Sequence, residues 1–151
     1  MKPLIVLIAV FGISLLLLKM ITGSYHLSLA GRIAMAAMLL FTAIGHFAFT
    51  KGMALMIPEP IPFKTGLVYL TGILEIAGAA GLLIPGLEVT TAWLLIIFFV
   101  MLLPANIHAA LKGIDLERAA TGGPGPRYLY FRIPLQALFI AWVYYFGIFS
   151  G

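Results

Sequence analysis

A few polar side chains stand inside long apolar stretches of the sequence, and their types are those that bind ligands or carry protons. Glu75 lies in YLTGILEIAGAAG (69–81), whereas Arg132 and Gln136 lie one helical turn apart in YFRIPLQALFIAWVYY (130–145). A charged group inside a bilayer costs on the order of a few kcal/mol, so it must be paired, neutralised or hydrated. These residues are therefore candidates for a functional site or for a buried structural contact.

Arg132 is the only cation deep within an apolar stretch, and we expect it to contact Glu75 across two helices. Gln136 would complete the hydrogen bonds of this pair. Gly72 and Gly78 share a helix face with Glu75, and small residues mark close approach between membrane helices, so Glu75 is predicted to face the bundle. Alternatively, Arg132 extends to the lipid headgroups and Glu75 is protonated. The small residues fit either a ligand cavity or close packing without one.

Two further stretches add polar groups at a similar predicted depth. His46 in GHF either carries a proton near the Glu75–Arg132 pair or is an interfacial histidine bonded to a backbone carbonyl. In LPANIHAA, Asn106 is predicted to face inward and His108 to lie at the interface. The candidate ligand-binding set is Glu75, Arg132, His46, Asn106 and Gln136. No metal site is expected, since no two of the possible ligands stand one helical turn apart.

The composition indicates a membrane protein. Of the 151 residues, 63% are hydrophobic and 9% are charged, whereas a soluble domain is roughly half apolar and about a quarter charged. The net charge of +4 is spread over connecting segments, which does not favour nucleic-acid binding. The absence of cysteine excludes a thiolate nucleophile, a disulfide and a cysteine metal site.

Hydropathy predicts an all-α polytopic bundle that forms a single membrane domain over residues 1–151. A helix of about 20 residues crosses the hydrocarbon core of a bilayer. The predicted spans cover about 3–21, 31–50, 65–84, 89–111 and 128–149. The connector KGMALMIPEPIPFK (51–64) contains MIPEPIP, which is predicted to be a stiff interfacial turn or a re-entrant lid. The connector KGIDLERAATGGPGPR (112–127) separates the last two spans, and its residues 122–126 are predicted to be a flexible loop.

The distribution of basic residues predicts the orientation. Six Lys and Arg residues fall on the side of the N-terminus, namely Lys2, Lys51, Lys64, Lys112, Arg118 and Arg127. The opposite side holds Lys19 and Arg32. Under the positive-inside rule the N-terminus is expected in the cytoplasm and the C-terminus outside.

Five segments in order, GHFAF, MIPEPIP, LTGILEIAGAAGLLIP, LLPANIHAAL and YFRIPLQALFIAWVYY, make the chain resemble the DoxX-like family of small bacterial membrane proteins. The resemblance runs from about residue 32 to 145. It implies a four-helix antiparallel core in the bacterial cytoplasmic membrane, to which residues 3–21 add one helix. Some members of the family are subunits of a thiosulfate:quinone oxidoreductase. The resemblance by itself implies little about the chemistry of this chain.

Two functions are favoured by these features over a third, a proton-coupled transporter, because the chain is short and shows no internal repeat. In the first, the bundle holds a lipophilic small molecule, such as a quinone, a sterol-like compound or an isoprenoid, at the polar residues. In the second, the protein is a non-catalytic accessory subunit of a larger membrane redox complex. Neither function requires a resident cofactor, although a quinone would fit the first, and the sequence does not assign catalysis.

Overall fold

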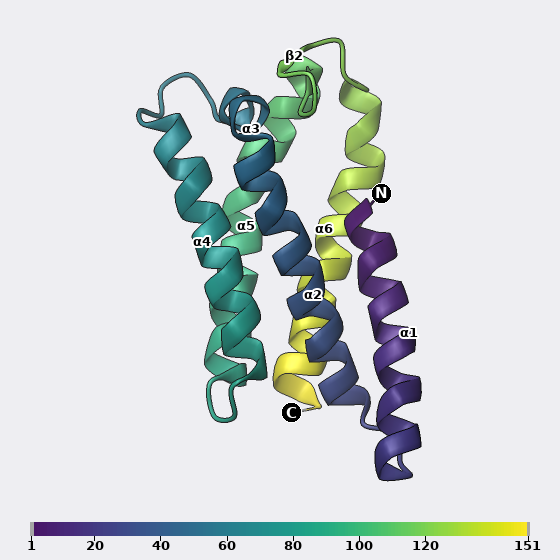
Figure 1. The fold of residues 1–151 in the computed structure, drawn as a ribbon. Helices are drawn as coiled ribbons and strands as arrows, with labels where there is room; N and C mark the ends of the chain where they lie inside the picture. The colour runs from purple at the N-terminus through teal and green to yellow at the C-terminus, as the bar shows by residue number, and fades with distance from the viewer. Residues whose placement is uncertain (1, 151) are drawn as a thin grey trace.

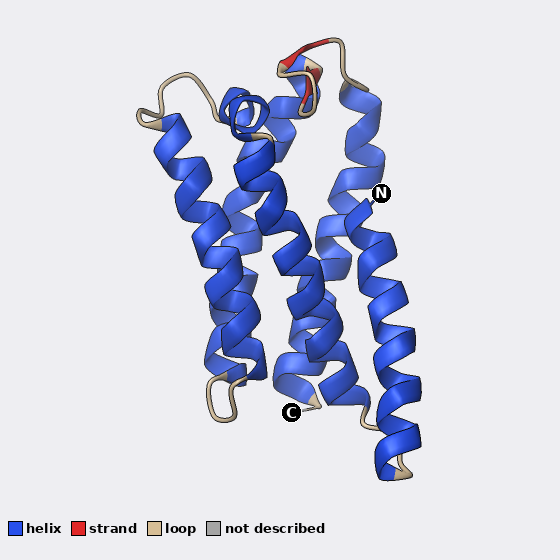
Figure 2. Cartoon of the chain, viewed as in Figure 1, coloured by secondary structure: helices blue, strands red, loops and turns tan. Residues whose placement is uncertain are grey.

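The computed structural model describes residues 2–150, and its long elements are all helices (Figures 1 and 2). Five helical spans, Lys2–Thr22, Leu27–Ala48, Lys64–Leu83, Glu88–Lys112 and Pro126–Phe149, are long and apolar enough to cross a membrane. They comprise α1 (Lys2–Thr22), α2 (Leu27–Ala48), α4 (Lys64–Leu83), α5 (Glu88–Lys112) and α6 (Leu129–Tyr144) with its π-helical continuation η2 (Tyr145–Phe149). The all-α membrane bundle expected from hydropathy is thus confirmed.

Glycine and proline set the ends of the long helices. Gly23 follows α1 with φ +76°, and Gly86, after Pro85, separates α4 from α5 with φ +87°. Both values lie in the left-handed region that glycine adopts without a steric penalty. Gly113 caps α5 at φ +60°, and its N–H is bonded to the carbonyl of Ala110 at 3.2 Å.

The two long connectors contain structure that the sequence pattern did not predict. The first begins with a short helix, α3 (Thr50–Met56), before the Pro-rich stretch. The second folds into a small hairpin of β1 (Ile114–Asp115) and β2 (Ala120–Thr121), followed by η1 (Pro126–Tyr128). The Asp115 carboxylate accepts backbone N–H groups of Glu117 and Arg118 at 3.0 and 3.1 Å, which fixes the turn.

The helices run alternately up and down, so that α3 and the hairpin lie together at one end of the bundle (Figure 1). The main contacts join α2 to α4, α1 to α2, α5 to α6 and α4 to α5. Among these contacts α1 takes part only through α2, so we call α2, α4, α5 and α6 the core of the bundle. The C-terminal end of the chain lies at the end opposite α3 and the hairpin (Figure 1).

Helix α1 packs on the outside of this core. Leu7 is fully buried, and the ring of Phe11 meets that of Trp142 edge-on with centroids 5.0 Å apart. Lys2 reaches the hairpin and binds Glu117 at 2.7 Å. Most of α1 nevertheless remains exposed, and the helix extends beyond the other helices at the end away from the hairpin (Figure 1).

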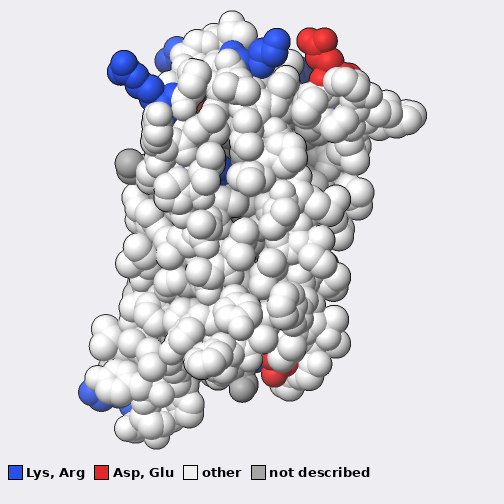
Figure 3. Space-filling model, turned by 180° about the vertical axis from the view of Figure 1, so that it is seen from behind, with Lys and Arg blue, Asp and Glu red and all other residues white. Residues whose placement is uncertain are grey.

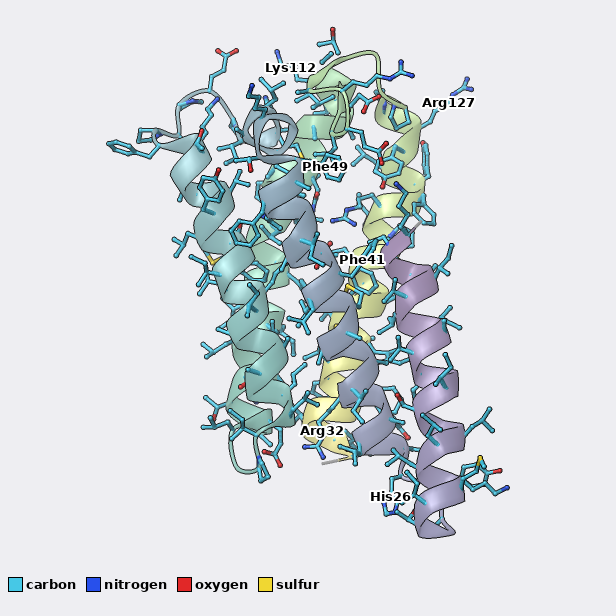
Figure 4. All side chains as sticks on the ribbon, viewed as in Figure 1. His26, Arg32, Phe41, Phe49, Lys112 and Arg127 are labelled. Carbon is cyan, nitrogen blue, oxygen red and sulfur yellow. The ribbon has the colours of Figure 1, made fainter. Side chains whose placement is uncertain are left out.

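Charged side chains are concentrated at the two ends of the bundle. Lys112 and Arg127 lie at the hairpin end, and Arg32 lies at the other (Figure 4). Arg32 forms an ion pair with Glu88 at 3.2 Å, which joins the beginnings of α2 and α5. The flank between the ends is almost entirely uncharged (Figure 3). This band is what a bilayer requires of the surface that it surrounds.

Small residues on α4 make close contacts rather than line a void. A Cβ atom added at Gly72 would stand 2.9 Å from the Cβ of His46, and one at Gly78 would stand 2.7 Å from Leu95. These distances are shorter than normal contacts between such atoms. Gly72 and Gly78 therefore let α2 and α5, respectively, approach α4 closely.

We expect Gly72→Ala to destabilise the protein because α2 must move away from α4 to admit the new methyl group. The cost should be about 1–3 kcal/mol, as for other overpacked positions. Gly66→Ala is the matched control on the same helix, since its added Cβ would meet nothing within 4 Å. Thermal unfolding in detergent should show a lower Tm for Gly72→Ala than for Gly66→Ala. Equal Tm values would show that the close approach is unimportant.

Candidate functional site

His46 and Glu75 meet between α2 and α4. The Nε2 atom of His46 lies 3.5 Å from Oε1 of Glu75, and both side chains are buried. The contact follows from the position of Gly72, one turn before Glu75, because the backbone of α2 can approach α4 only where no side chain intervenes. Sequence reasoning placed both residues in the candidate set, but did not predict that they would contact each other.

The other ring nitrogen of His46 defines which tautomer is present. Nδ1 lies 3.0 Å from the backbone oxygen of Val68 and 3.0 Å from the hydroxyl of Thr71. A carbonyl oxygen can only accept, so Nδ1 carries a hydrogen and donates it. The hydroxyl of Thr71 donates in turn to the carbonyls of its own helix, 3.0 Å away at Leu67 and 2.9 Å at Val68. The ring is thus held with Nε2 directed at Glu75.

The contact between His46 and Glu75 requires a proton. With Nδ1 protonated, a neutral imidazole presents a lone pair at Nε2, which would repel an ionised carboxylate. The second carboxyl oxygen of Glu75, Oε2, is buried without a hydrogen-bond partner, and Glu75 is only 4% exposed. An ion without hydrogen bonds is costly in such surroundings. One proton between Nε2 and Oε1 makes the contact attractive and leaves the pair with no net charge.

Arg132 contacts Asn106, not Glu75. Its guanidinium donates to Oδ1 of Asn106 at 3.3 Å, between α6 and α5. Within residues 2–150, no ion pair within 4.0 Å joins Arg132 to Glu75, so the direct contact expected between them is not formed. Asn106 is buried, as predicted, and lies about 9 Å inside the end of α5. Arg132 therefore points into the bundle rather than toward the headgroups.

Gln136 also faces α5, one turn beyond Arg132. Its side-chain amide donates to the backbone oxygen of Phe99 at 2.7 Å, and Gln136 is buried. It therefore does not complete hydrogen bonds around Glu75 and Arg132, as the sequence had suggested. Pro104 in α5 and Pro134 in α6 lie close along the chain to these contacts, and each removes one backbone N–H from its helix. The α5–α6 contact is therefore rich in polar groups for a membrane helix pair.

His108 lies outside this cluster, at the α3 end, where its Nδ1 is 2.9 Å from the carbonyl oxygen of Met56. This contact joins α5 to the end of α3, and the place of His108 at the membrane interface stays a prediction. A cavity of about 490 Å³ also lies at this end, lined in part by Phe47, Lys51 and Tyr69. None of the five candidate residues lines it. In the described part of the chain, no three metal-ligating side chains gather into a site.

Two polar contacts were not predicted, that of Thr71 with His46 and the ion pair between Arg32 and Glu88, although the sequence contains a signal for each. Thr71 stands one turn before Glu75 on the same face of α4, which is where a partner for a facing histidine would be expected. Arg32 and Glu88 each begin a helix at the end away from the hairpin, and the predicted topology had already placed them on the same side. The Arg32–Glu88 ion pair could therefore have been predicted from the sequence, because the two charges are opposite and lie on the same side of the membrane.

Replacement of Glu75 by Gln tests the shared proton. The Gln amide can donate a hydrogen to Nε2 of His46 as the protonated acid does, so Glu75→Gln should unfold close to the wild-type Tm. Glu75→Ala leaves Nε2 unpaired and a cavity beside it, and should cost about 2–4 kcal/mol. Thermal unfolding of the two variants compares these effects. If Glu75→Gln were as unstable as Glu75→Ala, the carboxylate would be needed in its charged form.

Comparison with known proteins shows how much of this architecture is shared. No curated protein and no solved structure matches the chain. One family model matches residues 35–147, which run from α2 through α6 into η2 and exclude α1. The match includes all five candidate residues and covers about three quarters of the chain. The chain therefore belongs to the family described as Domain of unknown function (DUF8561).

Proposed function

We propose that the protein holds a lipophilic small molecule, such as a quinone, a sterol-like compound or an isoprenoid, at its intramembrane polar cluster. This cluster comprises His46, Glu75, Asn106, Arg132 and Gln136. The observation that carries the proposal is the incomplete bonding of two ionisable groups in apolar surroundings. Oε2 of Glu75 is buried without a partner, and Arg132 makes a single side-chain hydrogen bond, to Asn106.

The bonding capacity of Arg132 supports access from the bilayer. A guanidinium has five N–H donors, yet Arg132 is only half-buried and binds one acceptor. None of its nitrogen atoms is among the fully buried atoms that lack a partner. A polar head arriving within the lipid layer could use the remaining donors.

The second candidate is a non-catalytic accessory subunit of a membrane redox complex. The close packing at Gly72 and Gly78 favours it, because these positions contribute contact rather than space for a ligand. The order of motifs that resembles the DoxX-like family fits both candidates, since some members of that family are subunits of quinone-linked complexes. In this second role the polar cluster only holds the helices together.

Ligand-dependent stability separates these two roles. We expect at least one member of a panel of quinones, isoprenoid alcohols and sterol-like amines to raise the Tm of the detergent-purified protein, because a ligand stabilises the folded form according to its occupancy. The ligand-induced rise in Tm should be smaller in Arg132→Gln or in Glu75→Gln. The variant with the smaller rise identifies the side chain that binds the polar head group of the ligand. If Arg132→Gln loses stability while no compound affects any form, the accessory role is favoured.

We further propose that the protein lies in the bacterial cytoplasmic membrane with its N-terminus, α3 and the hairpin in the cytoplasm. Because the chain has no cysteine, single cysteines at exposed Ser24 and Thr121 report the topology directly. In intact cells a membrane-impermeant maleimide should label Ser24→Cys and spare Thr121→Cys, and permeabilisation should expose both. The reverse labelling pattern would invert the orientation.

A further inference from the structure

The two parts of the polar cluster differ in charge. His46 and Glu75 meet at 3.5 Å, and the hydrogen-bonded Nδ1 of His46 requires one proton between the two side chains. The pair therefore contributes no net charge. Arg132 remains protonated under all ordinary conditions, and its side-chain partner Asn106 is neutral. Arg132 thus has a neutral amide as its one side-chain hydrogen-bond partner, and no acidic side chain of residues 2–150 forms an ion pair with it.

No other acidic side chain compensates Arg132. Glu88 is paired with Arg32 at the opposite end of α5, and Glu117 is paired with Lys2 in the hairpin. Asp115 accepts backbone N–H groups within the hairpin turn. Glu59 is an exposed residue of the connector between α3 and α4. Within residues 2–150, every acidic side chain thus contacts a group other than Arg132 or is exposed to solvent.

We infer that the ligand of the polar cluster is an amphiphile with a single anionic oxygen head, a carboxylate or a phosphate, which binds Arg132 beside Asn106. The inference rests on the proposed function and narrows its class of ligand, since an amine or an uncharged head would not form an ion pair with Arg132. A carboxylate or phosphate matches the planar N–H pairs of a guanidinium, and such charge-assisted bonds are among the strongest in proteins.

The position of the two side chains favours entry from the lipid layer. Arg132 is half-buried, whereas Asn106 behind it is buried, so the guanidinium lies between the amide and the surface. The adjacent prolines, Pro104 and Pro134, are both exposed. The alkyl tail of such an amphiphile would remain in the bilayer, where no cavity is needed to hold it.

Tail-matched compounds test this inference. Oleate, oleyl alcohol, oleylamine and oleoyl lysophosphatidate are added at equal mole fraction to the protein in a non-ionic detergent, and thermal unfolding is recorded. Oleate, lysophosphatidate or both should raise the Tm on the order of 5 °C at saturation, whereas the alcohol and the amine should not. An effect of oleate alone assigns the site to free acids, and one of lysophosphatidate alone to phospholipid heads.

Variants separate the site from a general effect of charged micelles. Arg132→Gln should abolish the rise, whereas Arg118→Gln should keep it, because the Arg118 side chain is 85% exposed in the hairpin. If Arg132→Gln does not fold, native mass spectrometry of the wild type gives the same answer by comparing retention of the four compounds.

Two results would overturn the inference. One is equal stabilisation by the amine or the alcohol, and the other is an acid effect that persists without Arg132. If the acids have no effect but a neutral quinone stabilises the protein through Arg132 or Glu75, the ligand-binding function stands and only the anionic class is rejected. If no compound of either panel acts on any form, the ligand-binding function is rejected as well.

Discussion

A polar group inside a hydrocarbon layer has no water to bind, so each one must find its partner within the protein. Here the partner is repeatedly a backbone carbonyl of another helix, whose oxygen has a second lone pair beyond its helical bond. His46 binds Val68 across α2 and α4, Gln136 binds Phe99 across α6 and α5, and Trp142 binds Gly31 across α6 and α2. Such bonds fix which helices are neighbours without requiring a second polar side chain.

The same requirement divides the polar cluster into two parts with different properties. Between α2 and α4, a histidine and an acid neutralise one another, with Thr71 orienting the ring. Between α5 and α6, a permanent cation is matched only by an amide. The first part pairs two ionisable side chains with each other, whereas the second pairs a cation with a neutral group. A molecule bound nearby would therefore meet one part without net charge and one with a positive charge.

The sequence predicted the spans well, because the length of an apolar run reflects the thickness of the bilayer. It also placed Arg132 and Asn106 at similar heights, because a helix rises by about 1.5 Å per residue, and the two side chains are in contact. It failed for the partner of Arg132 because depth does not specify rotation about the helix axis. Glu75 faces α2, because Gly72 lets the backbone of α2 near His46 approach α4 closely. Arg132 faces α5. Helix α3 and the hairpin were missed because they are short and fixed by local turns such as that at Asp115.

The placement of α1 has a consequence for biogenesis. This helix is synthesised before α6, yet the ring of Phe11 packs against Trp142 of α6 and Phe146 of η2, far later in the sequence. The ion pair between Lys2 and Glu117 likewise forms only after Glu117 has been synthesised. During synthesis α1 can pair with α2 alone, and its remaining contacts form only when α6 has entered the membrane. Docking of α6 against α1 is thus a later step of assembly than the pairing of α1 with α2, so truncation within α6 would also loosen α1.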